Sequence, residues 1–371
     1  MKPKIKIVYL TPWLFAGGAE RMLLDLLKNL DRDRFEPYLI TIKPAPAPFL
    51  WSDELKRLNI HIYNIGQSTR CGLLTIYRLW RILRNLKPDI VHTQLFLADF
   101  YGRLAGRLAG CRNIISTEHN LNQAEGYLKQ RLKRLSAPLA RRVVCVSRTV
   151  ADYASRHEGL EAGQIKVIYN GVPAEKFYYP GRTYEDRVCL KIGAVGRLTK
   201  QKGFDYLISA VALLPADKFS LEIAGEGEDR PFLTKQIQAL DLSGRVRLLG
   251  PLAAVGEWLK TVDIFVMPSR WEGLGLAALE AGLSGLPIIA SAVDGLQEII
   301  ADGRDGILFP AGNAEALARA IELLAADPKR RAVLGRVWQE KVRNNFTVKK
   351  MSAAYEILYF SLLNLPADNL K

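Results

Sequence analysis

The stretch between residues 263 and 281 places two carboxylates and two glycines in an order that suits ligand binding. A buried apolar run ends at Met267, a short loop carries Glu272, and a helical pattern begins near Leu276 and contains Glu280. In an open α/β sheet, ligands sit past the carboxyl ends of the strands. Both carboxylates can face the same crevice there and accept hydrogen bonds from a ligand with many hydroxyl groups.

Gly273, Leu274 and Gly275 precede this helix, and their glycines would let a ligand approach the backbone closely. Because the first amides of a helix have no partner within it, they favour a bound phosphate or sugar hydroxyl. Glu272 or Glu280 alone could be an ordinary loop or first-turn residue that interacts with the helix dipole. The complete string favours a ligand site.

Two cations follow another apolar run, residues 189–195. Arg197 and Lys202 stand in one loop, and Gly203 comes directly after Lys202. Two such cations could neutralise a leaving nucleoside diphosphate. Taken one at a time, each could equally be an exposed surface cation.

The first half of the chain holds fewer candidates. Gly17 and Gly18 lie in the turn between a first strand and a first helix, where a tight turn is the ordinary explanation. His119 follows the carboxyl end of one expected strand, and His92 that of another. A lone histidine is often structural. We expect a structural role for His92 and keep His119 as a candidate.

Further positions have two explanations each. Asn170 beside Gly171 could form a left-handed turn or contribute to a site. Gly250 and Leu252 follow an expected strand and could border the pocket of a nucleotide base, or form a plain loop. Gly225 could allow a close backbone approach or only a turn.

The elements around these residues alternate between β-branched runs and helical patterns. Residues 5–10, 35–42, 89–93, 113–117 and 143–147 are expected as strands in the first half, and residues 189–195, 220–224, 246–249, 263–267 and 287–290 in the second. Helix-length segments separate most of them. This rhythm predicts an α/β protein whose βα units surround parallel sheets.

A chain of 371 residues exceeds the usual limit of one hydrophobic core, so we expect two domains. Turn residues place a linker over residues 176–188, between a domain over 1–175 and a domain over 189–348. An amphipathic helix starts near residue 349. Its apolar face must dock, and we expect the segment 349–371 to pack back on the first domain.

The net charge of +14 is concentrated in residues 1–186, which hold 29 Lys and Arg against 17 Asp and Glu. Such an excess suits an anionic membrane, a pyrophosphate-bearing lipid or nucleic acid. We expect no nucleic-acid partner, because aromatic–basic interleaving, helix-turn-helix and finger spacings are missing. The four cysteines are far apart and expected as reduced thiols.

No apolar stretch reaches about 18 residues, and the N-terminus lacks a leader pattern. We therefore expect action in the cytosol or at the cytosolic face of a membrane. Residues 127–142 interleave leucines with cations and could form a helix lying on an anionic membrane, or a solvated helix face. Asp31-Arg32-Asp33 spells a metal-binding motif, but its place between a helix and a strand predicts a turn, so we expect no catalytic metal.

Taken together, these residues resemble the retaining glycosyltransferases of family 4, whose GT-B fold has two Rossmann-like, doubly wound domains facing a cleft. The resemblance rests on the two glutamates with seven residues between them and on segments in the family's order: 17–21, 168–172, 196–203, 223–227 and 294–298. It covers most of the chain and is strongest over residues 165–310.

The resemblance implies a role for each matched residue. Arg197 and Lys202 would bind the donor diphosphate, Glu280 the ribose, and Glu272 with the amides after Gly273 the donor sugar. It also implies that the Gly17–Gly18 loop faces the donor phosphates and that His119 is the active-site histidine.

The implied reaction moves a sugar from a nucleotide-diphosphate donor, a UDP-sugar first of all, to an acceptor hydroxyl with retention. The acceptor would be a lipid-linked or cell-surface glycan, and neither a metal nor another cofactor would be needed. Leu274 stands where many relatives have an aromatic residue, so the resemblance does not imply which sugar the donor carries. A nucleotide-sugar epimerase and a non-catalytic nucleotide-sugar-binding subunit remain alternatives.

Overall fold

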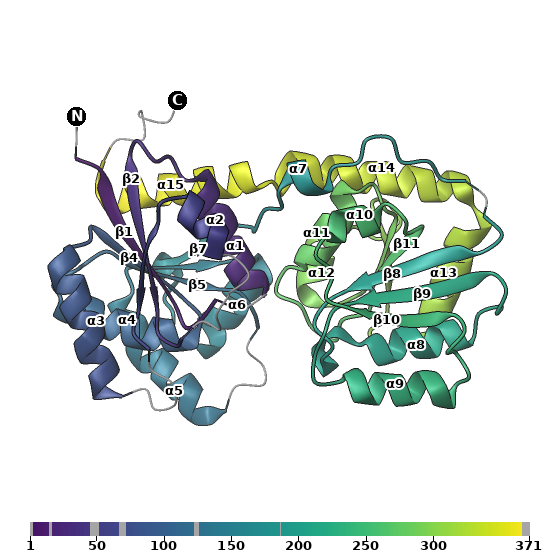
Figure 1. Cartoon of the computed structure of the whole chain (residues 1–371), viewed down its shortest axis with the longest axis horizontal. Coiled ribbons are helices and arrows are strands. Elements are labelled where there is room, and N and C mark those ends of the chain that lie inside the picture. Colours follow the sequence, from purple (N-terminus) through teal and green to yellow (C-terminus); the bar gives the residue numbers. More distant parts are fainter. Residues whose placement is uncertain are drawn as a thin grey trace. The chain divides into compact units, whose positions relative to one another are not determined.

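A computed structural model describes residues 3–14, 17–44, 52–66, 72–121, 126–185 and 187–365. The chain divides into two compact units (Figure 1). The first runs to Asn170 and resumes at Val348, and the second spans Gly171–Thr347. This is the two-domain α/β architecture of parallel sheets that the sequence predicts.

The described part of the first unit contains a seven-stranded parallel sheet in the order β3-β2-β1-β4-β5-β6-β7. The strands are β1 (Ile5–Thr11), β2 (Phe35–Thr41), β3 (His61–Asn64), β4 (Ile90–Gln94), β5 (Ile114–Glu118), β6 (Arg142–Cys145) and β7 (Ile165–Val167). The chain proceeds outward from β1 to β3 and then returns to place β4 on the other side of β1. The strand order therefore reverses between β1 and β4.

Helices cover both faces of this sheet. They are α1 (Gly18–Asn29), α2 (Ser52–Arg57), α3 (Leu73–Leu86), α4 (Phe96–Leu108), α5 (Tyr127–Ser136), α6 (Arg148–His157) and α15 (Val348–Leu362). One core cluster joins α1 and α15 to the sheet, and another joins α3 and α4 to its opposite face. Each face thus has its own apolar core.

The last helix, α15, is bound to the first sheet through a chain of buried hydroxyl and imidazole groups. The hydroxyl of Tyr359 lies 3.0 Å from that of Tyr9 and 2.9 Å from Nδ1 of His92. His92 Nε2 lies 2.8 Å from Oγ1 of Thr117, which is 3.2 Å from the hydroxyl of Tyr355. The helix adds polar contacts to its apolar packing, so it belongs to the first unit's core.

The described part of the second unit contains a six-stranded parallel sheet in the order β10-β9-β8-β11-β12-β13. The strands are β8 (Leu190–Val195), β9 (Phe219–Ala224), β10 (Val246–Gly250), β11 (Ile264–Met267), β12 (Ile288–Ser291) and β13 (Ile307–Phe309). Here the order reverses between β8 and β11. Ligands of doubly wound sheets bind at such a reversal.

The helices of the second unit are α7 (Ala174–Phe177), α8 (Phe204–Ala212), α9 (Arg230–Ala239), α10 (Val255–Leu259), α11 (Leu276–Leu283), α12 (Asp294–Ile299), α13 (Ala314–Ala326) and α14 (Pro328–Asn345). Helices α8, α9 and α13 share a core with one face of the sheet. Helix α11 packs on α14, where Trp338 Nε1 donates to the carbonyl of Ala278 over 3.2 Å. This packing holds α11 in place behind β11.

The segment from 171 to 188 differs from the expected assignment, because it belongs to the second unit. Arg182 donates to the carbonyls of Ser284, Val262 and Leu259 over 2.6, 2.7 and 2.7 Å. Pro and Gly in this stretch suggested a linker, but three hydrogen bonds from one guanidinium tie it to the second unit. Residues 171–175 therefore do not lie in the first domain as the sequence suggested.

Three strands were not anticipated from the sequence: β3, β7 and β13. Each is three or four residues long and lies at the edge of a sheet, and the residues of β3 are mostly exposed. An edge strand that is not buried on both faces lacks the apolar run that identifies a central strand. The prediction of one helix over 127–142 was also wrong, because α5 ends at Ser136 and β6 begins at Arg142.

Two smaller expectations can also be compared with the structure. Asn170 and Gly171 do not adopt positive φ, so the left-handed turn considered for them is wrong. Among the described cysteines, Cys111 and Cys145 are free and buried, and Cys189 is free and exposed. Cys71 lies outside the described residues.

Candidate active site

The loops that follow β8 and β11 meet at the reversal of strand order in the second unit. The backbone amide of Arg270 donates to the carbonyl of Gln201 over 2.8 Å, and Gln201 Nε2 donates to the carbonyl of Trp271 over 3.1 Å. The guanidinium of Arg270 makes two hydrogen bonds to Asp205, of 2.9 and 2.7 Å. These contacts fix the loop carrying Lys202 against the loop carrying Glu272.

Lys202 and Glu272 form an ion pair between these two loops. The Lys202 Nζ contacts Oε1 of Glu272, which also accepts a hydrogen bond from the Ser269 hydroxyl over 3.0 Å. The side chain of Glu272 is 6% exposed and that of Lys202 is 20% exposed. A buried carboxylate held by two donors keeps a fixed position, while the partly exposed ammonium can still meet a ligand.

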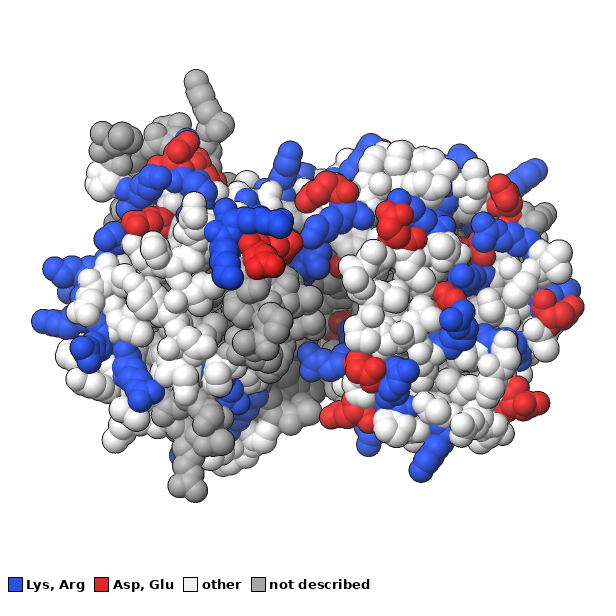
Figure 2. Space-filling model, viewed as in Figure 1, with Lys and Arg blue, Asp and Glu red and all other residues white. Residues whose placement is uncertain are grey.

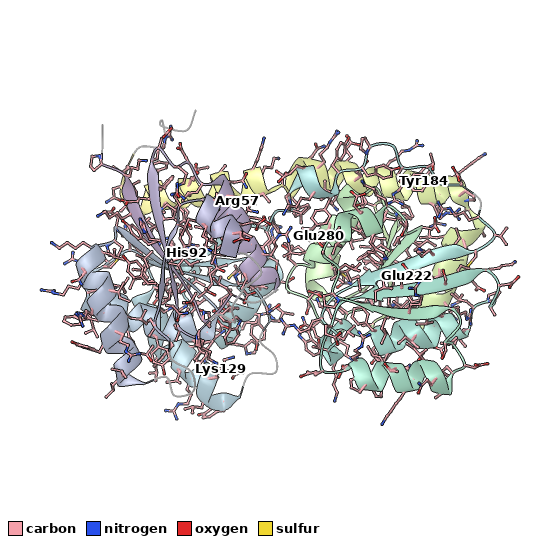
Figure 3. All side chains as sticks on the ribbon, in the orientation of Figure 1. Arg57, His92, Lys129, Tyr184, Glu222 and Glu280 are labelled. Atoms are coloured by element: carbon pink, nitrogen blue, oxygen red, sulfur yellow. The ribbon has the colours of Figure 1, made fainter. Side chains whose placement is uncertain are left out.

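The start of α11 lies directly after this ion pair. Gly275 caps the helix with a φ of 88°, a conformation that favours glycine, and Leu276 is its first residue. Gly273 and Leu274 are buried in the preceding loop. Glu280, labelled in Figure 3, is half-buried about one turn into the helix. The free amides of this helix start therefore stand beside the two carboxylates.

A close backbone approach fixes this loop from its other side. A Cβ placed on Gly295, in α12, would overlap the carbonyl of Gly273 and lie 2.7 Å from that of Glu272. Any side chain other than hydrogen at position 295 must displace the loop. The sequence resemblance included this glycine, but its packing role becomes visible only in the structure.

Glycines line the carboxyl ends of β8, β9 and β10. The amide of Gly225 donates to the carbonyl of Gly250 over 2.8 Å, and that of Gly196 donates to the carbonyl of Ala224 over 3.0 Å. Gly225 has a φ of 137°, and a Cβ there would overlap the carbonyl of Gly196. These glycines let the backbones at this edge pack directly against one another, and we call the group Gly196, Gly225 and Gly250 the glycine surface.

Arg197 and Leu252 border this glycine surface. Arg197 is exposed, and its guanidinium makes no hydrogen bond or ion pair with another residue that the structure describes. Leu252 is half-buried after β10. The second unit thus brings together an unpaired cation, an ion-paired lysine, two carboxylates and a helix start, which suits a phosphorylated ligand with hydroxyl groups.

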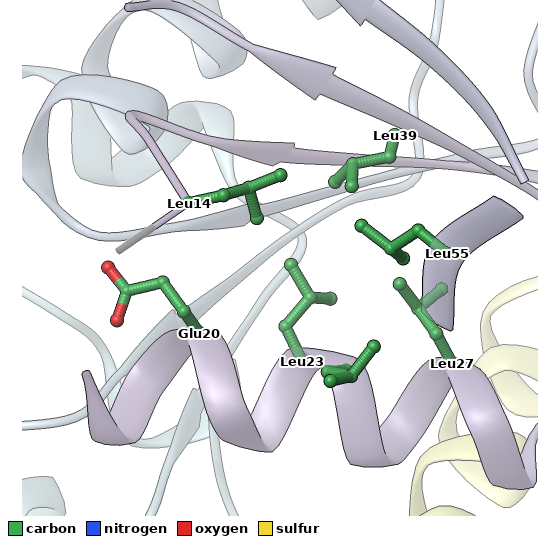
Figure 4. Close-up of a pocket in the computed structure, with 7 residues that line it drawn as sticks. Leu14, Glu20, Leu23, Leu27, Leu39 and Leu55 are labelled. Carbon is green, nitrogen blue, oxygen red and sulfur yellow. The ribbon is translucent and has the colours of Figure 1, made fainter. Parts of the chain in front are cut away.

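In the first unit, Gly17 and Gly18 lead into α1, where Glu20 is buried in the first turn. Figure 4 shows Glu20 at one end of a small pocket whose other lining residues are leucines, with its carboxylate at the side away from them. A Cβ on Gly17 would overlap Oε2 of Glu20. The Glu20 side chain would therefore have to move if Gly17 were replaced by a larger residue. The carboxylate of Glu20 suits the positive end of the helix dipole.

The two histidines of the first sheet have different surroundings. His92 is fully buried with both ring nitrogens hydrogen-bonded, and burial lowers its pKa to about 3. His119, just past β5, has an Nε2 that is sealed from solvent and has no partner among the described residues. Burial lowers its pKa to about 4, so the ring is neutral near pH 7. His92 is structural, while His119 retains an unused hydrogen-bonding atom.

The remaining sequence expectations concern metals and membranes. Asp31 accepts a hydrogen bond from the amide of Asp33 over 2.9 Å, so the metal-like motif forms a turn, as predicted. The part of the chain that the structure describes contains no group of three His, Cys, Asp or Glu side chains arranged to hold a metal ion. None of its helices combines the length and the apolar character needed to cross a membrane.

Two family models match the chain, one in each unit. The model described as "Glycosyltransferase Family 4" matches residues 16–176, and the one described as "Glycosyl transferases group 1" matches residues 190–340. Between them they cover the Gly17–Gly18 loop, both histidines and the whole site around Lys202 and Glu272.

Individual proteins are also similar to this chain. An Escherichia coli UDP-Gal:alpha-D-GlcNAc-diphosphoundecaprenol alpha-1,3-galactosyltransferase is 27% identical over 97% of this chain and 98% of its own length. The lipopolysaccharide core biosynthesis glycosyltransferase LpsE of Rhizobium meliloti is 38% identical over 44% of this chain and 47% of its own length. The Anabaena protein Alr3699/HepE, solved with UDP-glucose, has the same fold, with a TM-score of 0.84, 23% identity, and coverage of 96% of this chain and all of that one.

Three findings indicate the same fold and family: the two parallel sheets, the two family models, and the relatives aligned over nearly the full length of the chain. The chain is a glycosyltransferase of the two-domain GT-B fold and belongs to the family described as glycosyl transferases group 1, or glycosyltransferase family 4.

Proposed function

We propose that this glycosyltransferase moves a hexose from a UDP-sugar to a hydroxyl of a lipid-linked or cell-surface saccharide, with retention of the anomeric configuration. The observation that carries the donor assignment is the meeting of Lys202 and Glu272 beside the start of α11, at the reversal between β8 and β11. A diphosphate needs cations and amides, and a sugar needs carboxylates; this edge of the sheet supplies both.

The donor diphosphate would lie against Arg197, Lys202 and the first amides of α11. As the bond between the anomeric carbon and the phosphate oxygen breaks, negative charge accumulates on the leaving diphosphate. Cations and amides placed at that charge lower the barrier. Because the guanidinium of Arg197 has no partner among the described residues, it can bind phosphate without first leaving another contact.

The nucleoside would extend from there toward Gly250 and Leu252. Glu280 would accept hydrogen bonds from the ribose, and the glycine surface at the ends of β8 to β10 would let the base approach the backbone.

Retention favours attack on the same face from which the leaving group departs. In this route the acceptor oxygen bonds to the anomeric carbon while its proton passes to the departing phosphate oxygen. Glu272 is engaged by Lys202 and Ser269. We assign Glu272 to a hydroxyl of the donor sugar and not to a covalent intermediate. Its carboxylate is held in place at Oε1, as suits a group that accepts a hydrogen bond from a fixed position.

We propose that no metal ion takes part. Arg197 and Lys202 would supply the positive charge that a metal ion supplies in other transferases. Turnover should therefore persist in excess EDTA, and a loss of turnover that Mg²⁺ or Mn²⁺ restores would refute this part of the proposal.

The names of the relatives support the choice of substrates. The Escherichia coli relative is named for UDP-Gal and a diphosphoundecaprenol-linked sugar, and the Rhizobium relative for the lipopolysaccharide core. The Anabaena structure contains UDP-glucose. A UDP-sugar occurs in the first and third of these names and a lipid-linked saccharide in the first and second, which supports a UDP-sugar donor and a lipid-linked acceptor here.

We further propose that the first unit rests on an anionic membrane through residues 127–142. On α5, Tyr127, Leu128 and Leu135 are 75%, 71% and 71% exposed, and Arg131 and Arg134 are exposed among them. Exposed apolar residues interleaved with cations suit the interface of an anionic bilayer.

The neighbouring helices continue this surface. Helix α5 packs on α4, and α4 packs on α3. An open groove of about 300 Å³ is lined by Leu73, Ile76, Tyr77, Trp80 and Leu108. On the face shown in Figure 2, cations predominate over the first unit, whereas both signs alternate over the second. The apolar groove and the cations lie in the same unit as α5.

Vesicle sedimentation tests this contact. The chain should bind vesicles of phosphatidylglycerol more strongly than vesicles of phosphatidylcholine, and Leu128→Glu with Leu135→Glu should weaken that binding at least tenfold. Leu240→Glu, an exposed leucine of the second unit, is the matched control. Equal binding by the double variant would refute the assignment.

The transfer itself is tested by incubating the full chain with UDP-galactose, UDP-glucose or UDP-N-acetylglucosamine and a short-chain lipid analogue of N-acetylglucosamine-diphosphoundecaprenol. We expect one donor to yield a disaccharide product with an α linkage by NMR, because these donors are α-linked. A β linkage would contradict retention. Epimerised donor without transfer would favour an epimerase, and binding without turnover a non-catalytic subunit.

A further inference from the structure

Gln94 occupies the reversal of strand order in the first sheet. It is the last residue of β4, which lies between β1 and β5, and it pairs in register with Thr117 of β5. This is the first unit's counterpart of the place where Lys202 and Glu272 meet in the second. Ligands of doubly wound sheets bind at such positions.

The side chain of Gln94 is buried without using its hydrogen-bonding groups. The residue is 1% exposed, and neither Nε2 nor Oε1 has a hydrogen-bond partner among the residues that the structure describes. Buried polar groups are almost always paired, because an unpaired one loses its hydration without compensation. A primary amide with both ends unpaired is therefore unusual in a folded core.

The same strand shows what a structural polar residue looks like. His92, two residues earlier, uses both ring nitrogens, toward Tyr359 and Thr117. Thr93, between them, has Asp99 and Ser116 as partners. The polar side chains just before Gln94 are thus fully engaged within the protein, and Gln94 at the strand's carboxyl end is the exception.

The residue after Gln94 has a strained backbone. Leu95 has a φ of 68° and a ψ of 150°, a region that residues other than glycine rarely enter. This conformation turns the chain directly from β4 into α4, which starts at Phe96. Strain of this kind clusters at active sites and at positions that hold a ligand.

We propose that the amide of Gln94 binds the acceptor sugar through two neighbouring hydroxyl groups, and that Leu95 is the positioning residue that holds it there. An amide donates from Nε2 and accepts at Oε1, so it matches one hydroxyl that accepts and one that donates. His119 follows two residues after Thr117, the register partner of Gln94, so a second unpaired polar atom, its Nε2, lies at the same end of the sheet. This assignment rests on the glycosyl transfer proposed above.

The test replaces Gln94 by Met, which has similar volume and no polar group. The full chain is assayed with UDP-galactose and the short-chain lipid analogue named above. Gln94→Met should raise the acceptor KM at least tenfold, leave the dissociation constant of UDP unchanged, and leave the melting temperature equal or higher, because the variant removes an unpaired amide. Thr41→Val is the matched control: it removes another buried, unpartnered polar group, the hydroxyl at the end of β2, and should leave the acceptor KM unchanged.

Other outcomes would overturn the assignment of Gln94 to the acceptor, and they differ from a failure of the proposed function. An unchanged acceptor KM in Gln94→Met would overturn the assignment while transfer by the wild type still supported the proposed function. A weaker binding of UDP-galactose with an unchanged acceptor KM would assign Gln94 to the donor instead and would also overturn it. If the wild type transferred no sugar, saturation-transfer NMR of the lipid analogue alone would still decide, since its saturation should fall in Gln94→Met.

Leu95→Gly tests the positioning role without removing any hydrogen-bonding group. Glycine adopts this φ without strain, so the melting temperature should rise, while the more mobile Gln94 should raise the acceptor KM several-fold and leave UDP binding unchanged. A higher melting temperature with an unchanged acceptor KM would remove Leu95 from the proposal.

Discussion

Lys202 and Glu272 come from loops that follow neighbouring strands, and their ion pair closes the reversal between β8 and β11. Lys202 and Ser269 both contact the same oxygen of Glu272, and the side chain of Lys202 remains 20% exposed. A diphosphate that enters this edge must share Lys202 with Glu272 or take it over. The ion pair therefore links donor binding to the position of the sugar-binding carboxylate.

Replacing Lys202 by Ala should impair both donor binding and turnover. The variant removes a cation from the developing diphosphate charge and frees Glu272 as an unpaired buried carboxylate. We expect kcat to fall by about 10²- to 10³-fold, as for loss of one preorganised group that stabilises such charge. Lys200→Ala, an exposed lysine of the same short helical turn, should behave as the wild type in the same assay.

The variant Glu272→Gln separates the nucleotide from the sugar. It keeps the shape of the side chain and removes the charge that holds Lys202, so UDP alone should bind as tightly as before or more tightly. Turnover of the UDP-sugar should still fall, because the sugar loses a charged acceptor. Calorimetry measures the dissociation constant of UDP, and a steady-state assay measures turnover of the UDP-sugar. Weaker UDP binding would show that Glu272 does not compete for Lys202.

Gly295→Ala should displace the loop of Glu272 and Gly273, because a Cβ at this position overlaps the Gly273 carbonyl. We expect a loss of about 1–3 kcal/mol in the stability of the second unit, together with weaker UDP-sugar binding. Thermal unfolding and calorimetry measure the two effects. Gly244→Ala, where nothing lies within 4 Å of the added Cβ, is the control. Unchanged donor affinity in Gly295→Ala would mean that the loop is not part of the donor site.

The buried His92 predicts how stability depends on pH. Its pKa is about 3 in the folded protein and 6.5 without the protein environment, so the unfolded chain binds more protons between these values. Stability should therefore be lost as pH falls below about 6.5, by up to about 1.4 kcal/mol per unit. Asp99, whose pKa burial raises to about 7, acts in the opposite direction over pH 4–7.

Comparison of the wild type with His92→Gln isolates the histidine. Urea unfolding at several pH values between 4 and 7.5 should give curves that converge as the pH falls, because the variant has no imidazole to protonate. Parallel curves over this range would show that His92 does not take up a proton on unfolding.

The central strands of both sheets were predictable from the sequence, because a strand buried on two faces reads as an apolar run. Edge strands such as β3 and β13 were not, since their residues face solvent or are very few. The boundary of the first unit also escaped prediction. Turn residues suggested a linker after 175, and nothing in the pattern foretold that Arg182 would bind three carbonyls of the second unit.

Lys202 and Glu272 were each predictable as donor-site residues, through their motifs and the resemblance to a family. Their ion pair was not, because they lie 70 residues apart and meet only once the strand order is known. Gln94 gave only a weak signal, a polar residue at the end of a strand that begins with two apolar residues. Only the sheet topology places it at a reversal of strand order, and only its burial reveals the unpaired amide.

The most direct test of the donor site is calorimetric titration of the wild type, Lys202→Ala, Glu280→Ala and the control Lys200→Ala with UDP-, GDP- and ADP-sugars. We expect selective binding of a UDP-sugar by the wild type and Lys200→Ala, and at least a tenfold loss in both Lys202→Ala and Glu280→Ala. No binding of any nucleotide sugar by the wild type, or equal binding by all four proteins, would contradict a donor site between β8 and β11.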